Sequence, residues 1–544
     1  MTPVASFFTD LQNSLPPDVA QALLFSGDGE TRLFNLAVRL LEALDNTPSL
    51  LPIFRDVAVA AWECSPLSGR AAFLTHQVQL QSPFLSGQTA FFCAQCATLR
   101  PFVPERATEI NAAIKAGQLD SAKKLVVRHA NAESGNLFWW RFASYLGIQL
   151  GELDWYEPWL DKPPMPSGFV SAFRADYSFA RGQWADAAAL YAKAFERTHL
   201  SGWLVREGEC HLRLGERDHA LKLWRDALAM RPWQINLLLR VRDLERNSDL
   251  PGPPPLGRGE ILLYSWNHGR DLDNTLKALA ASHLDNCGLT VLDNGSNDDT
   301  PEVLRAWSDH FGHMRTVSLP TNVGAPAARN WLLSLESSKA ADWVVFLDDD
   351  ALVPPDWLGL FGTALRQYPQ AGIIGCRVVD MAAPLTVQSV DLHFESGLSG
   401  QQKEEKEEGG VSEKPRVVDS HMDGPDFGQY SYLRPAVSVT GCCHLLTRAN
   451  LDSVGLFDLR FSPSQFDDFE RDLRSCTQDI FPLYQGHLQL RHIKRSGAMA
   501  GISPWQQANI AGNLTKLWGS YPPHMVESIT EQDSRRVWED LSYE

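Results

Sequence analysis

The chain has 544 residues, a formal net charge of −17 and 44% hydrophobic residues. At about 150 residues per domain, this length and apolar content predict three or four globular domains. The acidic balance argues against a nucleic-acid or anionic-membrane surface, although a local basic patch is compatible with it. No apolar run is long enough to span a bilayer and the first ten residues lack a signal-peptide core, so we predict a cytoplasmic protein.

Nine cysteines are scattered along the chain, and Cys93 and Cys96 form a single CxxC pair. An odd, scattered set is typical of reduced thiols. A structural zinc site needs two further ligands, and the sequence shows no obvious second pair. Ordinary thiols, a redox pair and a zinc site therefore stay open for Cys93 and Cys96.

The first half of the chain has a helical pattern. Residues 1–110 read as amphipathic helices broken by proline and glycine, without recognisable chemistry. Within residues 111–248, glycines recur at positions 117, 151, 182 and 215, at intervals of 34, 31 and 33 residues. Such a period indicates stacked helical units. The best-matched positions are Ala187, Tyr191 and Ala194 after Gly182, and Ala220, Trp224 and Ala227 after Gly215.

These positions resemble the turn and second helix of tetratricopeptide repeats. Small residues allow paired helices to approach, and aromatic residues fill the gaps between them. The resemblance implies recognition of a peptide or protein on a concave face. Helices that only scaffold the next domain are the alternative.

Residues 249–258 mark a boundary, because three consecutive prolines favour an extended, semi-rigid linker. Strand and helix patterns alternate after it, which predicts an α/β domain over residues 259–505 with a mostly parallel, Rossmann-like sheet and helices on both faces. Residues 506–544 read as a helical tail. Predicted strands are Ile261–Trp266, Leu289–Leu292, Arg315–Leu319, Trp343–Leu347 and Gly372–Val378, and predicted helices are Leu272–Ser282, Thr300–Phe311, Ala325–Ser334 and Trp357–Gln367.

A charged insertion near residues 396–430 interrupts this alternation. Its core, Lys403–Gly410, lacks apolar anchors and is predicted to be a mobile excursion. A lid over the site and a solvated surface loop are the two interpretations.

Three carboxylates, Asp348, Asp349 and Asp350, directly follow the apolar strand Trp343–Leu347. In an open α/β sheet the ligand crevice lies outside the carboxyl ends of the strands. Asp348 and Asp350 are two residues apart, so both can reach one hard cation such as Mg²⁺ or Mn²⁺. A solvated acidic turn is the alternative when this stretch is taken alone.

Two further polar turns follow or precede elements of the same predicted sheet. Asp293–Thr300 follows the second strand, and Asn322–Asn330 opens a helix. Gly324 permits close backbone approach, and Arg329 can meet a phosphate or pair with an acid of the site. Three such turns after successive strands predict one ligand site.

Taken together, the motifs resemble family 2 glycosyltransferases with the GT-A fold. The match covers about residues 258–500 and carries the motifs in the family's order. They are Tyr264–Asn267, Asp293–Thr300, Asn322–Asn330, Phe346–Asp350, Pro354–Leu358, Gly455–Asp458, Phe466–Asp472 and Arg474.

The resemblance implies a role for each matching position. Asp293 is similar to the residue that reads the nucleotide base, and Asp348 and Asp350 resemble the DxD acids, with Asp350 and Asp348 as metal ligands. His492 resembles a late histidine that reaches the metal or diphosphate, ahead of His487. The donor-binding set implied is Asn267, Asp293, Asn294, Gly295, Asn322, Gly324, Arg329, Asp348 and Asp349.

The general base of the family normally comes from a Glu-Asp pair. Here the pair is Asp467-Asp468, so the first position departs from the pattern. We assign the base to Asp468, with Asp467 and Glu470 as competitors. A charged helix face, in which Arg471 and Arg474 pair with the acids, is the structural alternative.

The predicted activity is therefore metal-dependent, inverting transfer of a sugar from a nucleoside-diphosphate sugar to a hydroxyl group, with Mn²⁺ or Mg²⁺ as cofactor. The family favours a UDP-sugar. The helical repeats suggest a protein or peptide acceptor, with a glycan as the alternative. A nucleotidyltransferase and a non-catalytic binding protein with a degenerate domain are the competing functions.

Overall fold

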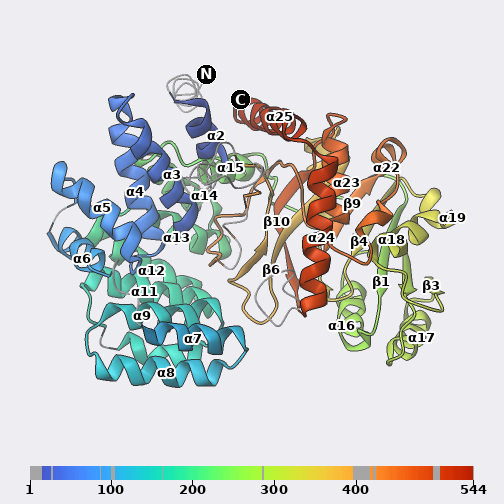
Figure 1. The fold of residues 1–544 in the computed structure, drawn as a ribbon, viewed down its shortest axis with the longest axis horizontal. Helices are drawn as coiled ribbons and strands as arrows, with labels where there is room; N and C mark the ends of the chain where they lie inside the picture. The colour runs from blue at the N-terminus through green and yellow to red at the C-terminus, as the bar shows by residue number, and fades with distance from the viewer. Residues whose placement is uncertain are drawn as a thin grey trace.

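The structure is a computed structural model that describes residues 15–25, 29–85, 87–99, 105–161, 163–284, 287–395, 417–418, 421, 424–493 and 503–542. A helical half formed by the N-terminal residues lies beside an α/β half that contains one large sheet (Figure 1). The core of the insertion, Lys403–Gly410, lies outside the described residues.

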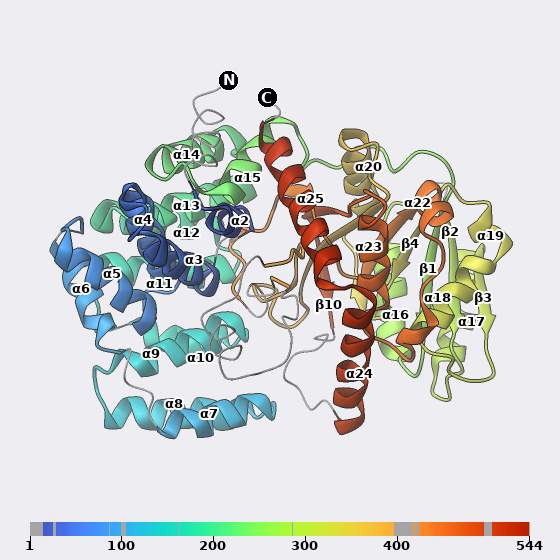
Figure 2. The same cartoon turned by 45° about the horizontal axis from the view of Figure 1, so that its top comes forward.

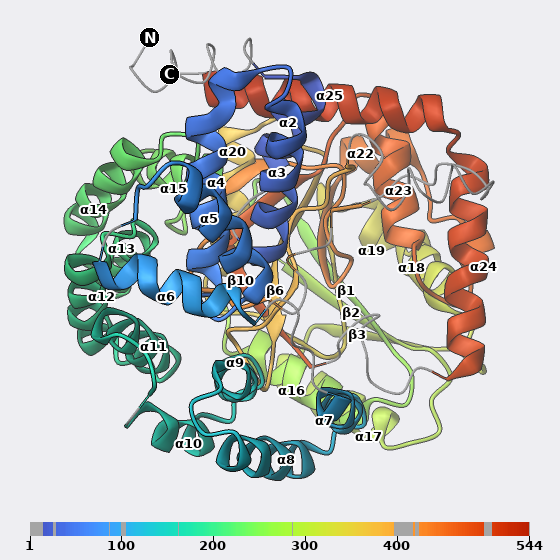
Figure 3. The ribbon, with the colours of Figure 1, turned by 60° about the vertical axis from the view of Figure 1, so that its left-hand side comes forward.

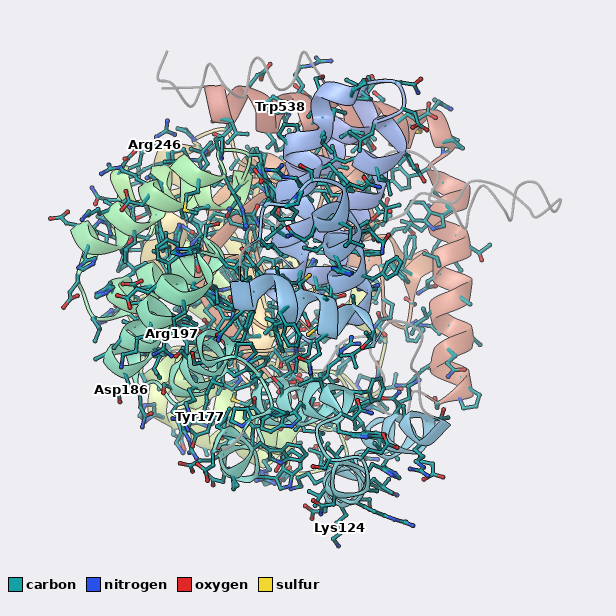
Figure 4. The ribbon with its side chains drawn as sticks, turned by 90° about the vertical axis from the view of Figure 1, so that its left-hand side faces the viewer. Lys124, Tyr177, Asp186, Arg197, Arg246 and Trp538 are labelled. Carbon is teal, nitrogen blue, oxygen red and sulfur yellow. The ribbon has the colours of Figure 1, made fainter. Side chains whose placement is uncertain are left out.

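The helical half forms an arc of packed helices, and the N-terminal helices α2–α6 lie on its inner side (Figure 3). Charged residues such as Lys124, Asp186 and Arg197 lie on its outer rim (Figure 4). The helices are α2 (Pro17–Phe25), α3 (Glu30–Ala43), α4 (Leu51–Cys64), α5 (Gly69–Gln81), α6 (Gly87–Ala97), α7 (Glu105–Lys115), α8 (Leu119–Ala132), α9 (Leu137–Ser144), α10 (Leu153–Tyr156), α11 (Ser167–Ala180), α12 (Trp184–Thr198), α13 (Gly202–Arg213), α14 (Arg217–Met230) and α15 (Ile235–Glu245).

The repeat positions explain how α11 to α14 pack. Gly215 separates α13 from α14 with a φ of 82°, a conformation that favours glycine. A Cβ on Gly208 would lie 2.3 Å from Nε1 of Trp224, so this glycine lets the two helices approach closely. The small and aromatic positions Ala187 and Tyr191 are fully buried. The predicted helical hairpins are therefore present, and their likeness to tetratricopeptide repeats stays a prediction.

The α/β half is built on one sheet, in the strand order β3-β2-β1-β4-β9-β6-β10-β5, with β7 beside β6 and β8 beside β10. The strands β3, β2, β1 and β4 are parallel, as predicted, whereas β9 runs antiparallel to β4 and β6. The sheet is consequently mixed rather than mostly parallel. The strands are β1 (Gly259–Ser265), β2 (Cys287–Asp293), β3 (Met314–Ser318), β4 (Trp343–Leu347), β5 (Ala351–Leu352), β6 (Ile373–Asp380), β7 (Val387–Ser389), β8 (Leu433–Pro435), β9 (Cys443–Thr447) and β10 (Leu483–His492).

The helices of this half confirm the alternating pattern. The predicted bounds of α17, α18, α20 and strand β4 agree with the structure, and the remaining predicted elements differ at their ends. The helices are α16 (Gly269–Ala280), α17 (Thr300–Phe311), α18 (Ala325–Ser334), α19 (Glu336–Lys339), α20 (Trp357–Gln367), α22 (Arg448–Val454), α23 (Asp467–Cys476), α24 (Pro504–Ser520) and α25 (Pro523–Ser542).

The two halves are joined through buried polar contacts as well as a shared apolar core. Arg242 of α15 pairs with Asp243 and Asp540, and Asp243 accepts the backbone N–H of Leu433. The C-terminal helix α25 runs along the boundary toward α2 (Figure 2). The proline-rich segment also lies on the α/β half, because Gly252 donates to the carbonyl of Gly359 at 3.2 Å. The segment is thus packed against the α/β half.

Two further sequence expectations concern membranes and thiols. Within the part of the chain that the structure describes, no helix combines the length and apolar character needed to cross a bilayer.

Cys93 and Cys96 are buried thiols of α6, and burial raises the pKa of Cys93 to about 12. The described residues around them form no metal-compatible group. Ordinary buried thiols are therefore the interpretation that this environment favours.

Candidate active site

The strand pairing brings His492 to the acidic turn. The last residue of β10, His492, is the register partner of Ala351 in β5, which directly follows the three aspartates. His492 Nε2 lies 2.9 Å from Asp350 Oδ1 and 3.8 Å from Asp348 Oδ2. Asp350 and His492 are 2% and 3% exposed. Two positions far apart in the sequence therefore form one buried cluster at the carboxyl end of β10.

Gln388 fixes the orientation of the His492 ring. Its Oε1 lies 2.9 Å from His492 Nδ1, while its Nε2 donates to the carbonyl of His492 at 3.2 Å. Since Oε1 can only accept, Nδ1 carries a hydrogen and Nε2 faces the acids. Burial disfavours the imidazolium, but Cys442 and Asp350 raise the pKa of His492 to about 12. The Nε2 atom is thus the ring nitrogen available to a proton or a cation.

Replacing Gln388 with leucine is expected to weaken binding of Mn²⁺ by about 10–100-fold, because the hydrogen-bond partner that orients a metal-binding histidine contributes that much to affinity. The Gln388→Glu variant keeps an acceptor for Nδ1 and should bind Mn²⁺ more tightly than the leucine variant. Electron paramagnetic resonance of free Mn²⁺ measures both. Equal affinities for wild type and Gln388→Leu would contradict the positioning role.

Asp348, Cys442 and His492 form a metal-compatible group, in which the three ligand atoms lie within 4.8 Å of one another. Burial raises the pKa of Asp348, while His492 and Arg329 oppose the shift. Burial also raises the pKa of Cys442, while His492 lowers it. The sulfur of Cys442 is a soft donor, which suits Mn²⁺ poorly. The carboxylates of Asp348 and Asp350 with one imidazole nitrogen are oxygen and nitrogen donors, which fit Mn²⁺.

Asp349 has a different orientation from its neighbours. Its Oδ2 accepts the hydroxyl of Ser265 at 2.6 Å, and its carbonyl accepts the hydroxyl of Thr275 at 2.9 Å. These bonds tie the acidic turn to the end of β1 and to α16. Asp349 therefore holds the turn in place, while Asp348 and Asp350 face His492.

The predicted donor turns are linked to each other by side-chain amides. Asn294 donates to Asn322 Oδ1 at 3.0 Å and accepts the backbone N–H of Val323 at 3.0 Å. Asn267 Oδ1 accepts the N–H of Asn297 at 2.8 Å. A Cβ on Gly295 would lie 2.5 Å from the carbonyl carbon of Thr321, so only glycine fits where these turns meet. The loops after β1, β2 and β3 consequently form one connected surface.

Asp293 and Gly324 complete this surface. Asp293 ends β2, is 5% exposed, and accepts the N–H of Ser296 through Oδ1 at 2.9 Å. Gly324, with a φ of 85°, precedes α18 beside Pro463. The roles of these residues in reading a nucleotide stay predictions.

Arg329 pairs with an acid of the same site. Its Nη1 lies 2.5 Å from Asp467 Oδ2, and its guanidinium carbon lies 5.2 Å from the ring centroid of Phe457. Burial works against the charge, but Asp467 raises the pKa of Arg329 well above its usual range. Of the two roles predicted for Arg329, the ion pair is the one present here.

The Arg329→Met variant is expected to lower the free energy of unfolding by about 3–5 kcal/mol, because it leaves Asp467 buried without its cation. Adding Asp467→Asn should recover part of this loss. Chemical denaturation of the single and double variants measures both effects. A stable Arg329→Met variant with an altered donor KM would instead support phosphate binding by this arginine.

The three candidate bases have different surroundings at the start of α23. Asp467 is buried against Arg329, and Glu470 pairs with Arg474 at 2.9 Å and accepts the Tyr521 hydroxyl at 3.2 Å. Asp468 is partly exposed and accepts the backbone N–H groups of Gly441 and Phe469. The charged-helix alternative thus describes Glu470, while Asp468 keeps a carboxylate at the surface of the site.

His487 is placed away from this cluster. It lies on the bulged part of β10, where its Nε2 is 3.0 Å from Asp243 of α15. This histidine therefore belongs to the contact between the halves.

Sequence reasoning missed Gly441, Cys442 and Gln388. The carbonyl of Cys442 accepts the N–H of Asp348 at 2.9 Å, and a Cβ on Gly441 would lie 2.4 Å from Asp468 Oδ2. Gly441 and Cys442 thus connect the base candidate to the acidic turn. The only local signal was a glycine before two cysteines at the start of a strand, and Gln388 had none.

Comparisons with known proteins agree with the motifs. The family profile of Glycosyl transferase family 2 matches residues 261–416, which end before Asp468 and His492. The O-antigen biosynthesis protein RfbC of Myxococcus xanthus is 26% identical over 259 residues, or 46% of this chain. The chain spans about a fifth of that relative, since the match covers 19% of its length.

Solved structures with partial similarity include two glycosyltransferases. The mannosyltransferase PcManGT from Pyrobaculum calidifontis, in complex with GDP-Man and Mn²⁺, has 15% identity and a TM-score of 0.34, covering 59% of this chain and 85% of that one. GalNAc-T7 with UDP, GalNAc and Mn²⁺ has 12% identity and a TM-score of 0.35, covering 50% of this chain and 49% of that one. On the profile match, residues 261–416 contain a glycosyl transferase family 2 domain.

Proposed function

We propose that this chain is a metal-dependent, inverting glycosyltransferase that moves a sugar from a nucleoside-diphosphate sugar to a hydroxyl group. The observation that carries the proposal is the cluster of Asp348, Asp350 and His492 Nε2 at the carboxyl edge of the sheet, inside and beside the matched family domain. The loops after β1, β2 and β3 would hold the nucleotide at the same edge.

Different residues of the chain would bind the metal ion and transfer the proton. Asp348, Asp350 and His492 would hold Mn²⁺ or Mg²⁺, which would supply positive charge to the leaving diphosphate. Asp468 would take the proton from the acceptor hydroxyl as that oxygen attacks the anomeric carbon. The sugar–phosphate bond breaks as the new glycosidic bond forms, and the nucleoside diphosphate leaves from the opposite face.

We also propose the class of the acceptor and the nucleotide of the donor. RfbC is named for O-antigen biosynthesis, and this name favours a glycan acceptor over the protein or peptide acceptor that the helical repeats suggest. UDP is the nucleotide that we propose on the sequence resemblance.

A panel of nucleotide sugars tests the activity without knowledge of the acceptor, because water can replace the acceptor slowly. We expect one donor to release nucleoside diphosphate with Mn²⁺ or Mg²⁺ and none with EDTA. Release of pyrophosphate would instead identify a nucleotidyltransferase. No release and no thermal stabilisation by metal plus any donor would indicate a non-catalytic protein.

A further inference from the structure

A cavity of about 400 Å³ lies where the inner side of the helical arc meets the α/β half. Its walls come from α3, α4, α9, α11 and α13, from the turn before α15, and from residues 424–430 of the α/β half. Figure 3 shows α3 and α4 in front of the arc, with β6 and β10 beyond them. This volume falls in the range of small-ligand pockets, about 300–1,000 Å³.

The charges that line the cavity cancel. Three acidic residues and three arginines contribute to its wall. Arg231 pairs with Glu63 through two contacts of 2.5 and 2.7 Å, and Arg206 lies 2.5 Å from Asp176. These two arginines are already paired, so neither of them is free to bind a phosphate or another anion.

The remaining lining is suited to an uncharged, hydroxylated ligand. The hydroxyl of Ser144 and the amides of Gln149 and Gln234 contribute to the wall beside several aromatic rings. Trp233 is 5% exposed, and its indole N–H has no hydrogen-bond partner. A buried indole N–H normally finds a partner, so this one is an unsatisfied donor in a residue of the cavity wall.

The cavity wall is also connected to the candidate active site. The hydroxyl of Thr386 donates to the carbonyl of Gln149, and the carbonyl of Thr386 accepts the N–H of Asp380 at 2.9 Å. Asp380 ends β6 and is the register partner of His492. A ligand in this cavity would therefore lie on the helical side of the strands that carry the site.

We propose that this cavity binds a neutral carbohydrate segment of the acceptor, an inference that rests on the proposed function. The balanced charges, the unsatisfied indole N–H and the mixed amide, hydroxyl and aromatic wall favour this class. Lining helices offer no strand edge with which a peptide backbone could pair. The helical half thus contributes a sugar-recognition site to the transferase.

The test measures binding without turnover. Fluorescently labelled full-length protein is applied to an array of neutral oligosaccharides and to an array of peptides. The Gln234→Trp and Thr31→Trp variants place a bulky ring in the cavity from two separate walls. The control variant Gln183→Trp also replaces a glutamine with tryptophan, but on an exposed turn before α12. Circular dichroism and thermal unfolding confirm that each protein is folded.

We expect wild type and Gln183→Trp to retain a subset of the oligosaccharides, and both cavity variants to lose that signal at least tenfold. Donor hydrolysis should stay unchanged in all of them, since none of these positions contacts the acidic turn. Retention of no oligosaccharide, retention of peptides alone, or oligosaccharide binding unaffected by either cavity variant would overturn the proposal. Oligosaccharide retention without nucleoside-diphosphate release would refute the proposed enzyme function alone.

Discussion

The Asp350→Ala variant should lose metal-dependent release of nucleoside diphosphate by about 10³-fold, which corresponds to about 4 kcal/mol of transition-state stabilisation. Asp350 is buried 2.9 Å from His492 Nε2, so its removal deletes one anionic donor and leaves the imidazole without its partner. Fewer anionic donors bind a divalent cation more weakly. The concentration of Mn²⁺ needed for half-maximal release should rise accordingly.

The controls separate this effect from unfolding. Asp350→Asn keeps the shape of the side chain but removes the charge, so it should show a similar loss with a smaller change in thermal stability. Asp309→Ala removes an exposed carboxylate of α17 and should behave as wild type. If Asp350→Ala released nucleoside diphosphate with an unchanged requirement for Mn²⁺, the metal role of the acidic turn would be wrong.

The Asp468→Asn variant should lower kcat by about 10²–10⁴-fold, the usual contribution of a general base. An amide can still accept the N–H of Gly441, which Asp468 Oδ2 accepts at 2.8 Å, but it cannot take a proton from the attacking hydroxyl. The KM for donor and the requirement for Mn²⁺ should therefore stay near wild type. Steady-state kinetics at varied donor and metal concentrations measure this split.

The neighbouring acids provide matched comparisons. Glu470→Gln changes a residue that is paired with Arg474 and hydrogen-bonded to Tyr521, so we expect a small effect on kcat. Burial raises the pKa of Asp467, Arg329 opposes this shift and Asp468 adds to it, so Asp467→Asn should act mainly through stability. A large kcat loss in Glu470→Gln combined with an active Asp468→Asn would move the base to Glu470.

Several elements of this protein could be predicted from the sequence because their signals lie in short, contiguous stretches of residues. A continuous apolar run predicted the buried strand Trp343–Leu347, and the helix predicted over Thr300–Phe311 has the same bounds in the structure. The order of the polar turns indicated the family that the profile match supports for residues 261–416. The spacing of the glycines likewise predicted the helical hairpins that α11 to α14 form.

Other parts depended on contacts between distant positions. The antiparallel insertion of β9 made the sheet mixed, and alternation of strands and helices carries no signal for strand direction of that kind. The ion pair between Arg329 and Asp467 joins residues 138 positions apart. The sequence alone therefore left two roles open for Arg329, an ion pair with an acid of the site and binding of a phosphate. The domain limits drawn from composition also gave no indication that the proline-rich segment lies against α20.

By itself the sequence determined the chemical types at the site: three carboxylates after a buried strand, polar turns around them and a late acidic pair. The tertiary structure decided which of these groups meet. Register between β10 and β5 places His492 against Asp350, and Gln388 selects the nitrogen that faces it. Strand register and ring orientation arise from packing over long sequence separations, and a pattern of residue types along one chain does not encode them.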